Sequence, residues 1–305
     1  MRTEDDSWDI VSSVGATALG VAALRAGESR RTDALFHDPY AELMVSAVGS
    51  AAWTRLSQSD IGEIDQSLVR SYGALGDLLV ARTCYFDDYL EAAAAAGIRQ
   101  IVIVAAGLDA RAYRLDWPSG TTIFELDQPK VLQFKASALA ARKPAADRRE
   151  VPVDLRDDWP TALRDNGFDP EIPTGWLVEG LLRYLPADAQ DRLLTAIAAL
   201  SAPGSRVALN MTQDDRAPSR SEPEDGRDRL LATLDIDLDV NALWYPIEGR
   251  SDPVGWFTEQ GWTAVRADPV AVLTERGREV PGEVAEQMRT HLLMTATRPG
   301  GDSTP

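Results

Sequence analysis

Short apolar runs rich in β-branched residues alternate with amphipathic segments from about residue 98 onward. The runs that predict strands cover 101–105, 122–127, 151–155, 175–180 and 206–211. The segments between them have apolar residues three and four positions apart, as in 186–201, and therefore predict helices. Strands that are apolar along their length and alternate with helices indicate a parallel sheet covered on both faces.

The first 97 residues carry the helical pattern alone. Helices are expected within 12–31, 33–48 and 67–97, with Pro39 in a first turn or at a break and Gly97 just past the end of the last helix. We expect these residues to form a helical cover over the sheet.

The second half contains one interruption. Residues 212–229 are polar, charged and proline-containing, which predicts a mobile loop or insert. A helix at 254–262 and strands at 262–269 and 291–298 follow. We predict one domain spanning 1–305, with a helical cover (1–97), an α/β core (98–211 and 250–298) and an insert or lid (212–249).

Charge and composition exclude several classes of protein. The 305 residues carry a formal net charge of -17 with a sequence pI of about 4.5. Nucleic acid and anionic membrane surfaces would be repelled. The N-terminus has no signal-peptide pattern, and no apolar run approaches the ~20 residues that span a bilayer. We expect a soluble cytoplasmic protein, whose oligomeric state is not readable from its residues.

Metal chemistry is not expected either. The single cysteine, Cys84, lies in a helical pattern and is expected to be a buried, inert thiol, and the chain has two histidines. Too few nitrogen and sulfur ligands remain for a zinc enzyme, so we expect no metal.

Acidic residues lie at or just after the carboxyl ends of four predicted strands: Asp109, Asp127, Asp154 and Glu179. In open α/β sheets the ligand lies beyond the carboxyl ends of the strands. Asp127 comes 20 residues after Gly107, the spacing at which an acid accepts hydrogen bonds from adenosine ribose hydroxyls. This spacing fits both nicotinamide enzymes and S-adenosylmethionine (AdoMet) enzymes.

The loop at 105–109 favours the second cofactor. A pyrophosphate needs a helix N-terminus without like charge, and Asp109 stands at that position. AdoMet has no phosphate and carries a cationic ammonium and sulfonium, which suit an acidic pocket. A role for Asp109 as a helix cap or first-turn acid explains this residue equally well.

Several motifs resemble the leucine carboxyl methyltransferase-like family of AdoMet-dependent methyltransferases, in particular its bacterial, actinobacterial branch. They are VAAGLDARAYRL (104–115), FELDQPKVLQFK (124–135), VPVDLRDDWPTAL (151–163) and LVEGLLRYLP (177–186). The resemblance implies a Rossmann-like, seven-stranded methyltransferase fold with an N-terminal helical cover and a late insert. One departure is that Ala-Ala-Gly stands where many methyltransferases have Gly-x-Gly.

The resemblance also implies roles for single residues. It places Asp127 at the ribose hydroxyls, Asp154 and Leu155 at the adenine, and Glu179 near the methionine portion. Gly107 would allow close approach of the cofactor, and Arg82 would pair with its carboxylate. We add Arg183 and Tyr184 as substrate-facing candidates because they follow the strand that ends at Glu179.

These observations favour an AdoMet-dependent O-methyltransferase acting on a carboxylate of a small molecule or peptide. A carboxylate is already ionised at neutral pH, whereas an alcohol or amine usually needs a base, and histidines are scarce. The alternatives are an NAD(P)-dependent oxidoreductase on the same fold and a non-catalytic AdoMet-binding protein.

Overall fold

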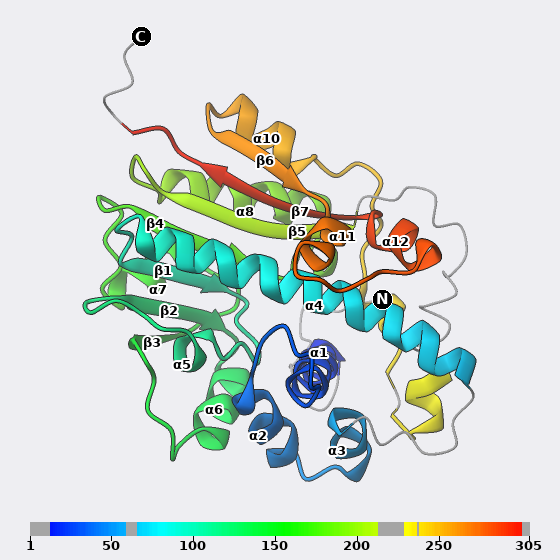
Figure 1. The fold of residues 1–305 in the computed structure, drawn as a ribbon. Helices are drawn as coiled ribbons and strands as arrows, with labels where there is room; N and C mark the ends of the chain where they lie inside the picture. The colour runs from blue at the N-terminus through cyan, green and yellow to red at the C-terminus, as the bar shows by residue number, and fades with distance from the viewer. Residues whose placement is uncertain (1–12, 59–65, 213–228, 237, 301–305) are drawn as a thin grey trace.

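A single twisted sheet forms the centre of the molecule. The computed structural model describes residues 13–58, 66–212, 229–236 and 238–300, which form a seven-stranded sheet in the order β3-β2-β1-β4-β5-β7-β6 (Figure 1). β1 to β5 run parallel, and β7 runs antiparallel to its neighbours β5 and β6. The fold class predicted from the sequence is thereby confirmed. The strands are β1 (Gln100–Val104), β2 (Thr122–Asp127), β3 (Asp147–Pro152), β4 (Thr174–Val178), β5 (Arg206–Thr212), β6 (Thr263–Ala267) and β7 (His291–Thr297).

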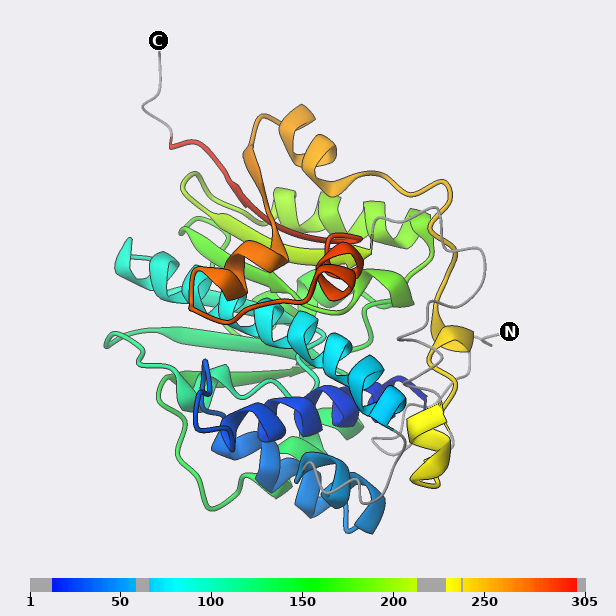
Figure 2. The same ribbon diagram turned by 45° about the vertical axis from the view of Figure 1, so that its right-hand side comes forward.

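Helices cover both faces of the sheet (Figures 1 and 2). One face carries α4 (Gln66–Ala95) and α11 (Pro269–Thr274), and the other carries α7 (Trp159–Asp165), α8 (Ala187–Ala199) and α10 (Pro253–Glu259). Other helices of the described residues are α1 (Ser13–Ser29), α2 (Pro39–Ala47), α3 (Ala51–Ser57), α5 (Arg111–Arg114), α6 (Pro129–Ala138), α12 (Gly282–Met288) and the short η1 (Leu182–Tyr184) and η2 (Asn241–Leu243). No described helix has an apolar stretch long enough to cross a bilayer.

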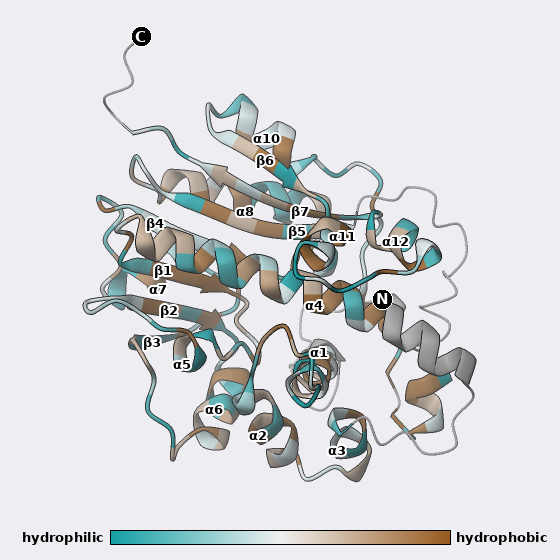
Figure 3. Cartoon of the chain, viewed as in Figure 1, coloured by the Kyte–Doolittle hydropathy of each residue, from teal (hydrophilic) through white to brown (hydrophobic). Residues whose placement is uncertain are grey.

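The central strands are apolar on both faces because both are buried. Along β1, Ile101 and Ile103 belong to the core under α4, whereas Val102 and Val104 belong to the core under α7 and α8. Successive side chains of a strand point to opposite faces, so a strand between two helical layers has no solvent side. Figure 3 shows the apolar colouring concentrated along these strands.

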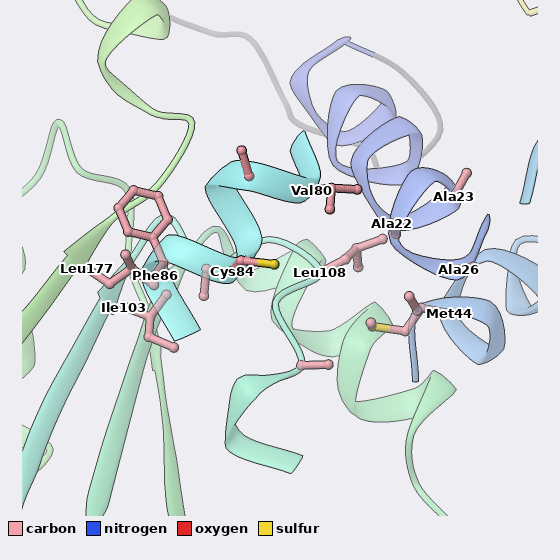
Figure 4. Packing of buried hydrophobic residues seen from close by; sticks show 14 of the residues in the cluster. Ala22, Ala23, Ala26, Met44, Val80, Cys84, Phe86, Ile103, Leu108 and Leu177 are labelled. Carbon is pink, nitrogen blue, oxygen red and sulfur yellow. The ribbon is translucent and has the colours of Figure 1, made fainter. Parts of the chain in front are cut away.

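The N-terminal cover is tied to the sheet by small side chains. Ala22 and Ala26 of α1 are buried in the same core as Val80 of α4 and Met44 of α2 (Figure 4). Leu108, from the loop after β1, is 2% exposed and is part of this cluster. The cover therefore packs directly on the loop in which the sequence places a cofactor.

Several predicted strand boundaries need correction, and the strand expected at 175–180, for example, ends at Val178. The strand expected at 151–155 is β3, Asp147–Pro152, which begins four residues earlier and ends at a proline. It is the edge strand beside β2, so charged residues are tolerated, and Arg148 pairs with the buried Glu125 of β2. The strand expected at 101–105 ends at Val104, because Ala105 has a left-handed backbone with φ 53°.

The predicted insert is partly packed into the core. Residues 213–228 of the expected mobile loop lie outside the described residues. Beyond them, Leu230, Leu231, Leu234 and Ile236 are buried in the core that includes α4. This part of the chain therefore packs on the rest of the domain through apolar side chains.

Candidate functional site

The loop after β1 turns sharply at the carboxyl end of the sheet. Ala105 and Gly107 both have positive φ, 53° and 49°. For alanine this conformation costs on the order of 1–2 kcal/mol, and such strain concentrates at functional sites. A Cβ on Gly107 would lie 3.5 Å from the Ala18 Cβ of α1. The loop thus passes close to α1 at the residue that has no side chain.

Asp127 holds this loop at the end of β2. Its Oδ2 accepts a hydrogen bond from the Gly107 N–H at 2.6 Å, and its Oδ1 accepts from the Gln128 N–H at 2.7 Å. Burial raises the pKa of the Asp127 carboxyl to about 6. A carboxylate has about four lone-pair sites, so two acceptor positions remain for a ligand.

Asp154 lies two residues beyond β3 and is linked to Asp127 through Gln128. The Gln128 side-chain amide donates to Asp154 Oδ2 at 2.5 Å, while Arg156 binds the same carboxylate through its backbone N–H and guanidinium. Leu155 packs against the core on the α7 side of the sheet. Gly107, Asp127 and Asp154 therefore form one hydrogen-bonded series along three adjacent strand ends.

Asp109 and Glu179 belong to a second, buried group centred on Arg111. The Arg111 guanidinium is 3% exposed and pairs with Asp87 at 2.7 Å, with Glu179 at 2.7 Å, and with Asp109. Asp109 Oδ1 also accepts from the Arg111 backbone N–H, at the start of α5. Burial alone would raise the pKa of Asp109, but Arg111 holds it at about 2.

This pairing changes the electrostatic picture expected from the sequence. Asp109 and Glu179 are paired with arginines, as is Asp154 through Arg156. The four acids therefore do not form an unpaired acidic pocket. The loop still carries an acid at the start of α5, but that acid is neutralised by Arg111. A direct contact between Asp109 and a cofactor stays a prediction.

Arg82 connects this group to a large cavity. Its Nε donates to Glu179 Oε1 at 2.7 Å, and its side chain lines the cavity beside Gly180. The Nη atoms lie 3.6 and 3.8 Å from the position that a Cβ on Gly180 would take. The ion pair to Glu179 uses Nε, and both Nη atoms lie beside Gly180, which also lines the cavity.

The cavity lies between the helical cover and the carboxyl ends of β4, β5 and the start of β7. It has an empty volume of about 1040 Å³, including the part open to solvent. Arg183 and Tyr184, both in η1, line it, so the structure brings these two predicted residues together with Arg82. The Arg183 guanidinium carbon lies 4.9 Å from the ring centroid of Trp244.

His291 also lines this cavity and was not among the residues predicted from the sequence. Its Nδ1 lies 3.5 Å from the Thr212 hydroxyl. Burial, with the nearby charges of Arg82 and Arg183, lowers the pKa of His291 to about 4. The imidazole is therefore neutral at pH 7. The sequence alone does not indicate that His291 belongs to the site, because Thr212, Arg82 and Arg183 come from distant segments of the chain.

Comparisons with known proteins agree with this architecture. Residues 18–198 match the leucine carboxyl methyltransferase family. A relative in Mycobacteroides abscessus is 51% identical over 290 residues, covering 93% of this chain and 95% of its own. Another in Mycolicibacterium smegmatis is 47% identical over 314 residues, covering 98% and 97%. Both are provisionally named S-adenosyl-L-methionine-dependent methyltransferases.

A solved structure shows the same fold at low identity. A protein of Bordetella parapertussis, provisionally described as exported, has a TM-score of 0.50 and 12% identity, over 93% of this chain and 97% of its own. The names of both relatives give a methyltransferase and not the alternative, an oxidoreductase. With its strand-end acids, its seven-stranded sheet and relatives at about half identity over nearly the whole chain, this chain belongs to the leucine carboxyl methyltransferase family of AdoMet-dependent methyltransferases.

Proposed function

We propose that this AdoMet-dependent methyltransferase methylates a carboxylate oxygen. The charge of the cavity supports the proposal most. Of the described residues that line it, none is an aspartate, glutamate or lysine, and Arg82 and Arg183 supply its charge. Arg82 is paired with Glu179 behind the wall, so Arg183 is the main cation of the cavity. In a chain with a net charge of -17, a cavity lined by arginines and by no acid favours an anionic ligand over an amine.

The neutral histidine also favours a carboxylate. An alcohol or amine acceptor usually needs a base, and the lowered pKa of His291 makes it a weak one. A carboxylate oxygen forms the new bond to the methyl carbon while the carbon–sulfur bond breaks and its electron pair stays on sulfur. No proton moves, so the protein has only to orient the carboxylate and exclude water.

The strand-end residues fit the cofactor that the family uses. When bound, AdoMet supplies an activated methyl group on sulfur. We propose that Asp127 accepts from the ribose hydroxyls with its remaining lone pairs, and that Asp154 and Leu155 meet the adenine. Arg82 would bind the cofactor carboxylate through Nη.

The remaining predicted contacts follow from the same placement. Gly107 would allow close approach of the cofactor, and Glu179 and Asp109 would lie near the methionine portion. Arg183 would bind the acceptor carboxylate, with Tyr184 beside it.

A methyl-transfer assay with radiolabelled AdoMet and a panel of carboxylic acids, alcohols and amines tests the proposal. Replacing Arg183 with methionine should raise KM for the acid at least tenfold, since a charge-assisted hydrogen bond contributes about 1.5–3 kcal/mol. The dissociation constant for S-adenosylhomocysteine should not change. Arg266→Met is the matched control, because Arg266 pairs with Asp252 on the surface of β6.

Two results would contradict the proposal. Methylation of alcohols or amines in preference to every acid would assign a different acceptor. Tight binding of AdoMet with no transfer to any acceptor would support a non-catalytic AdoMet-binding protein. A thermal-shift comparison of AdoMet with NAD(H) and NADP(H) checks the cofactor itself.

A further inference from the structure

Two helices line the cavity, each with a row of side chains on one face. The row on α1 runs from Ala16 through Gly20 to Leu24, and the row on α4 runs from Leu75 to Arg82; we call these rows the α1 stripe and the α4 stripe. Residues three and four apart share one face of a helix, so each stripe is a continuous wall. Apart from Thr17 in the α1 stripe and Arg82 at the end of the α4 stripe, these walls consist of apolar residues and glycine.

The far end of the cavity is apolar as well. Trp53 and Leu56 of α3 line it together with Leu231, Leu238 and Val240 from the segment that follows β5. Trp53 and Leu56 are buried. The space between these walls is partly open to solvent, so a ligand can enter it from outside.

Most polar groups of the cavity lie at the opposite end, where the sheet ends. Asn210 and Thr212 come from β5, His291 from β7, Arg183 and Tyr184 from η1, and Arg82 from the last turn of the α4 stripe. Asn210 is already used, since its Oδ1 accepts from the Gly180 N–H at 2.8 Å. The cavity therefore has a cationic end at the strands and an apolar end under the helices.

We infer that the acceptor is an amphipathic monocarboxylic acid, with its carboxylate at Arg183 and an acyl or similarly apolar body between α1, α3 and α4. This inference rests on the proposed carboxylate methylation and names its substrate class. A peptide fits less well, because each buried peptide group brings an N–H and a C=O that need partners. Among the described residues of the helical walls, Thr17 is the polar side chain that lies away from the strand ends, so a bound peptide would find few hydrogen-bond partners there.

A series of linear monocarboxylic acids from four to sixteen carbons, assayed with radiolabelled AdoMet, tests the inference. We expect kcat/KM to rise about fourfold per methylene until the cavity is filled, which corresponds to ~0.8 kcal/mol per buried CH₂. The α,ω-diacid of the best length should be at least tenfold poorer, since its second charge would enter the apolar end. A leucine-ending peptide should be no better than the shortest acid.

Two substitutions in the α1 stripe should move the preferred length in opposite directions. Gly20→Leu should shorten it and Leu24→Ala should lengthen it, each by about two to three carbons, the number that each change adds or removes beyond Cβ. A Cβ on Gly20 would meet the Trp53 ring at 3.8 Å, an ordinary van der Waals contact. Loss of stability alone would lower activity at every length without moving the optimum.

The outcomes separate the two proposals. Methylation of acids with no dependence on chain length, or a preference for the peptide, overturns the amphipathic acid and leaves carboxylate methylation standing. If no carboxylate is methylated, the proposed function fails. Calorimetric titration of the same acids into protein saturated with S-adenosylhomocysteine then tests the ligand class. Affinity that rises with chain length supports an amphipathic acid as the ligand, and affinity that is independent of chain length, or no binding, overturns it.

Discussion

Arg111 is the residue whose loss should show most clearly how the buried acids are held. Its guanidinium pairs with Asp87, Asp109 and Glu179 and is 3% exposed. Replacing it with methionine keeps much of the apolar volume but leaves three carboxylates without their shared cation. Removing one partner of a buried ion pair is costly because the charge that remains has lost its solvent and its counterion.

The size of the effect follows from the pKa of Asp109. Arg111 holds that pKa at about 2 against an ordinary value of 3.8. With ~1.4 kcal/mol per pKa unit, Asp109 alone contributes on the order of 2 kcal/mol to the free energy of unfolding at neutral pH. Glu179, whose pKa Arg111 and Arg82 lower against the effect of burial, adds to this. We expect Arg111→Met to cost about 3–5 kcal/mol at pH 7.5.

The pH dependence has a defined sign. In the native protein, the lowered pKa of Asp109 gives stability that is fully present above pH 4 and is lost only as pH falls through 2. In the variant, Glu179 and Asp87 keep Arg82 and Arg114 as partners, whereas Asp109 has lost its ion pair. The buried Asp109 carboxylate then has a raised pKa, so the stability of the variant falls as pH rises. The difference between the two proteins should therefore be smaller at pH 5.5 than at pH 7.5, by at least about 1 kcal/mol.

Urea unfolding at both pH values, followed by tryptophan fluorescence and circular dichroism, measures this difference. Arg192→Met is a matched control, because Arg192 pairs with Asp188 on the exposed surface of α8 and should matter little. An Arg111→Met penalty that is equal at both pH values would refute the electrostatic account and indicate that packing alone is lost.

Three further predictions concern the loop and Asp127. Asp127→Ala should weaken AdoMet binding at least tenfold in calorimetry, about 1–3 kcal/mol for a lost charged acceptor, and unchanged affinity would remove Asp127 from the site. Because the pKa of Asp127 is raised to about 6, its carboxylate protonates as pH falls, so the dissociation constant for AdoMet should rise about tenfold from pH 7.5 to pH 5. A flat profile would mean that Asp127 does not bind the cofactor as an anion. Gly107→Val should destabilise the fold more than Gly49→Val in thermal unfolding, because both have positive φ but only Gly107 would meet another residue, Ala18. Equal losses would show that the contact with α1 is unimportant.

Most of the fold could be predicted from hydropathy because most strands are buried on both faces. The runs around β1, β2, β4 and β5 located those strands to within two residues. β3 was misplaced because its sequence, DRREVP, is charged. Its arginines pair with acids of the same strand, Arg148 with Glu150 and Arg149 with Asp147, and they also contact Glu125 and Phe124 of β2. Pairing of this kind leaves no periodic signal.

The candidate site could be predicted only in part. Strand ends are easy to locate, so the acids there were found. The role of Arg111 was not predicted, although Arg111 follows Asp109 by two residues. The prediction rested on the acids at the strand ends and did not include the cations that pair with them. The cavity was missed for a different reason. Its walls come from residues 16–24, 75–82 and 231–244, which look like ordinary core stripes until the fold brings them together.

The way in which the cavity is assembled also constrains when it can exist. Its residues range from Ala16 to Leu293, so almost the whole chain must have been synthesised before its walls can meet. On the ribosome, α1 and α4 emerge long before β5 and β7. The two helices can pack on each other during that interval, but the side of the cavity formed by β5 and β7 is still absent. Contacts between such distant segments slow folding. A chain that stops before β7 would lack His291 and Leu293, so we expect premature termination to abolish acceptor binding while most of the parallel sheet is already encoded.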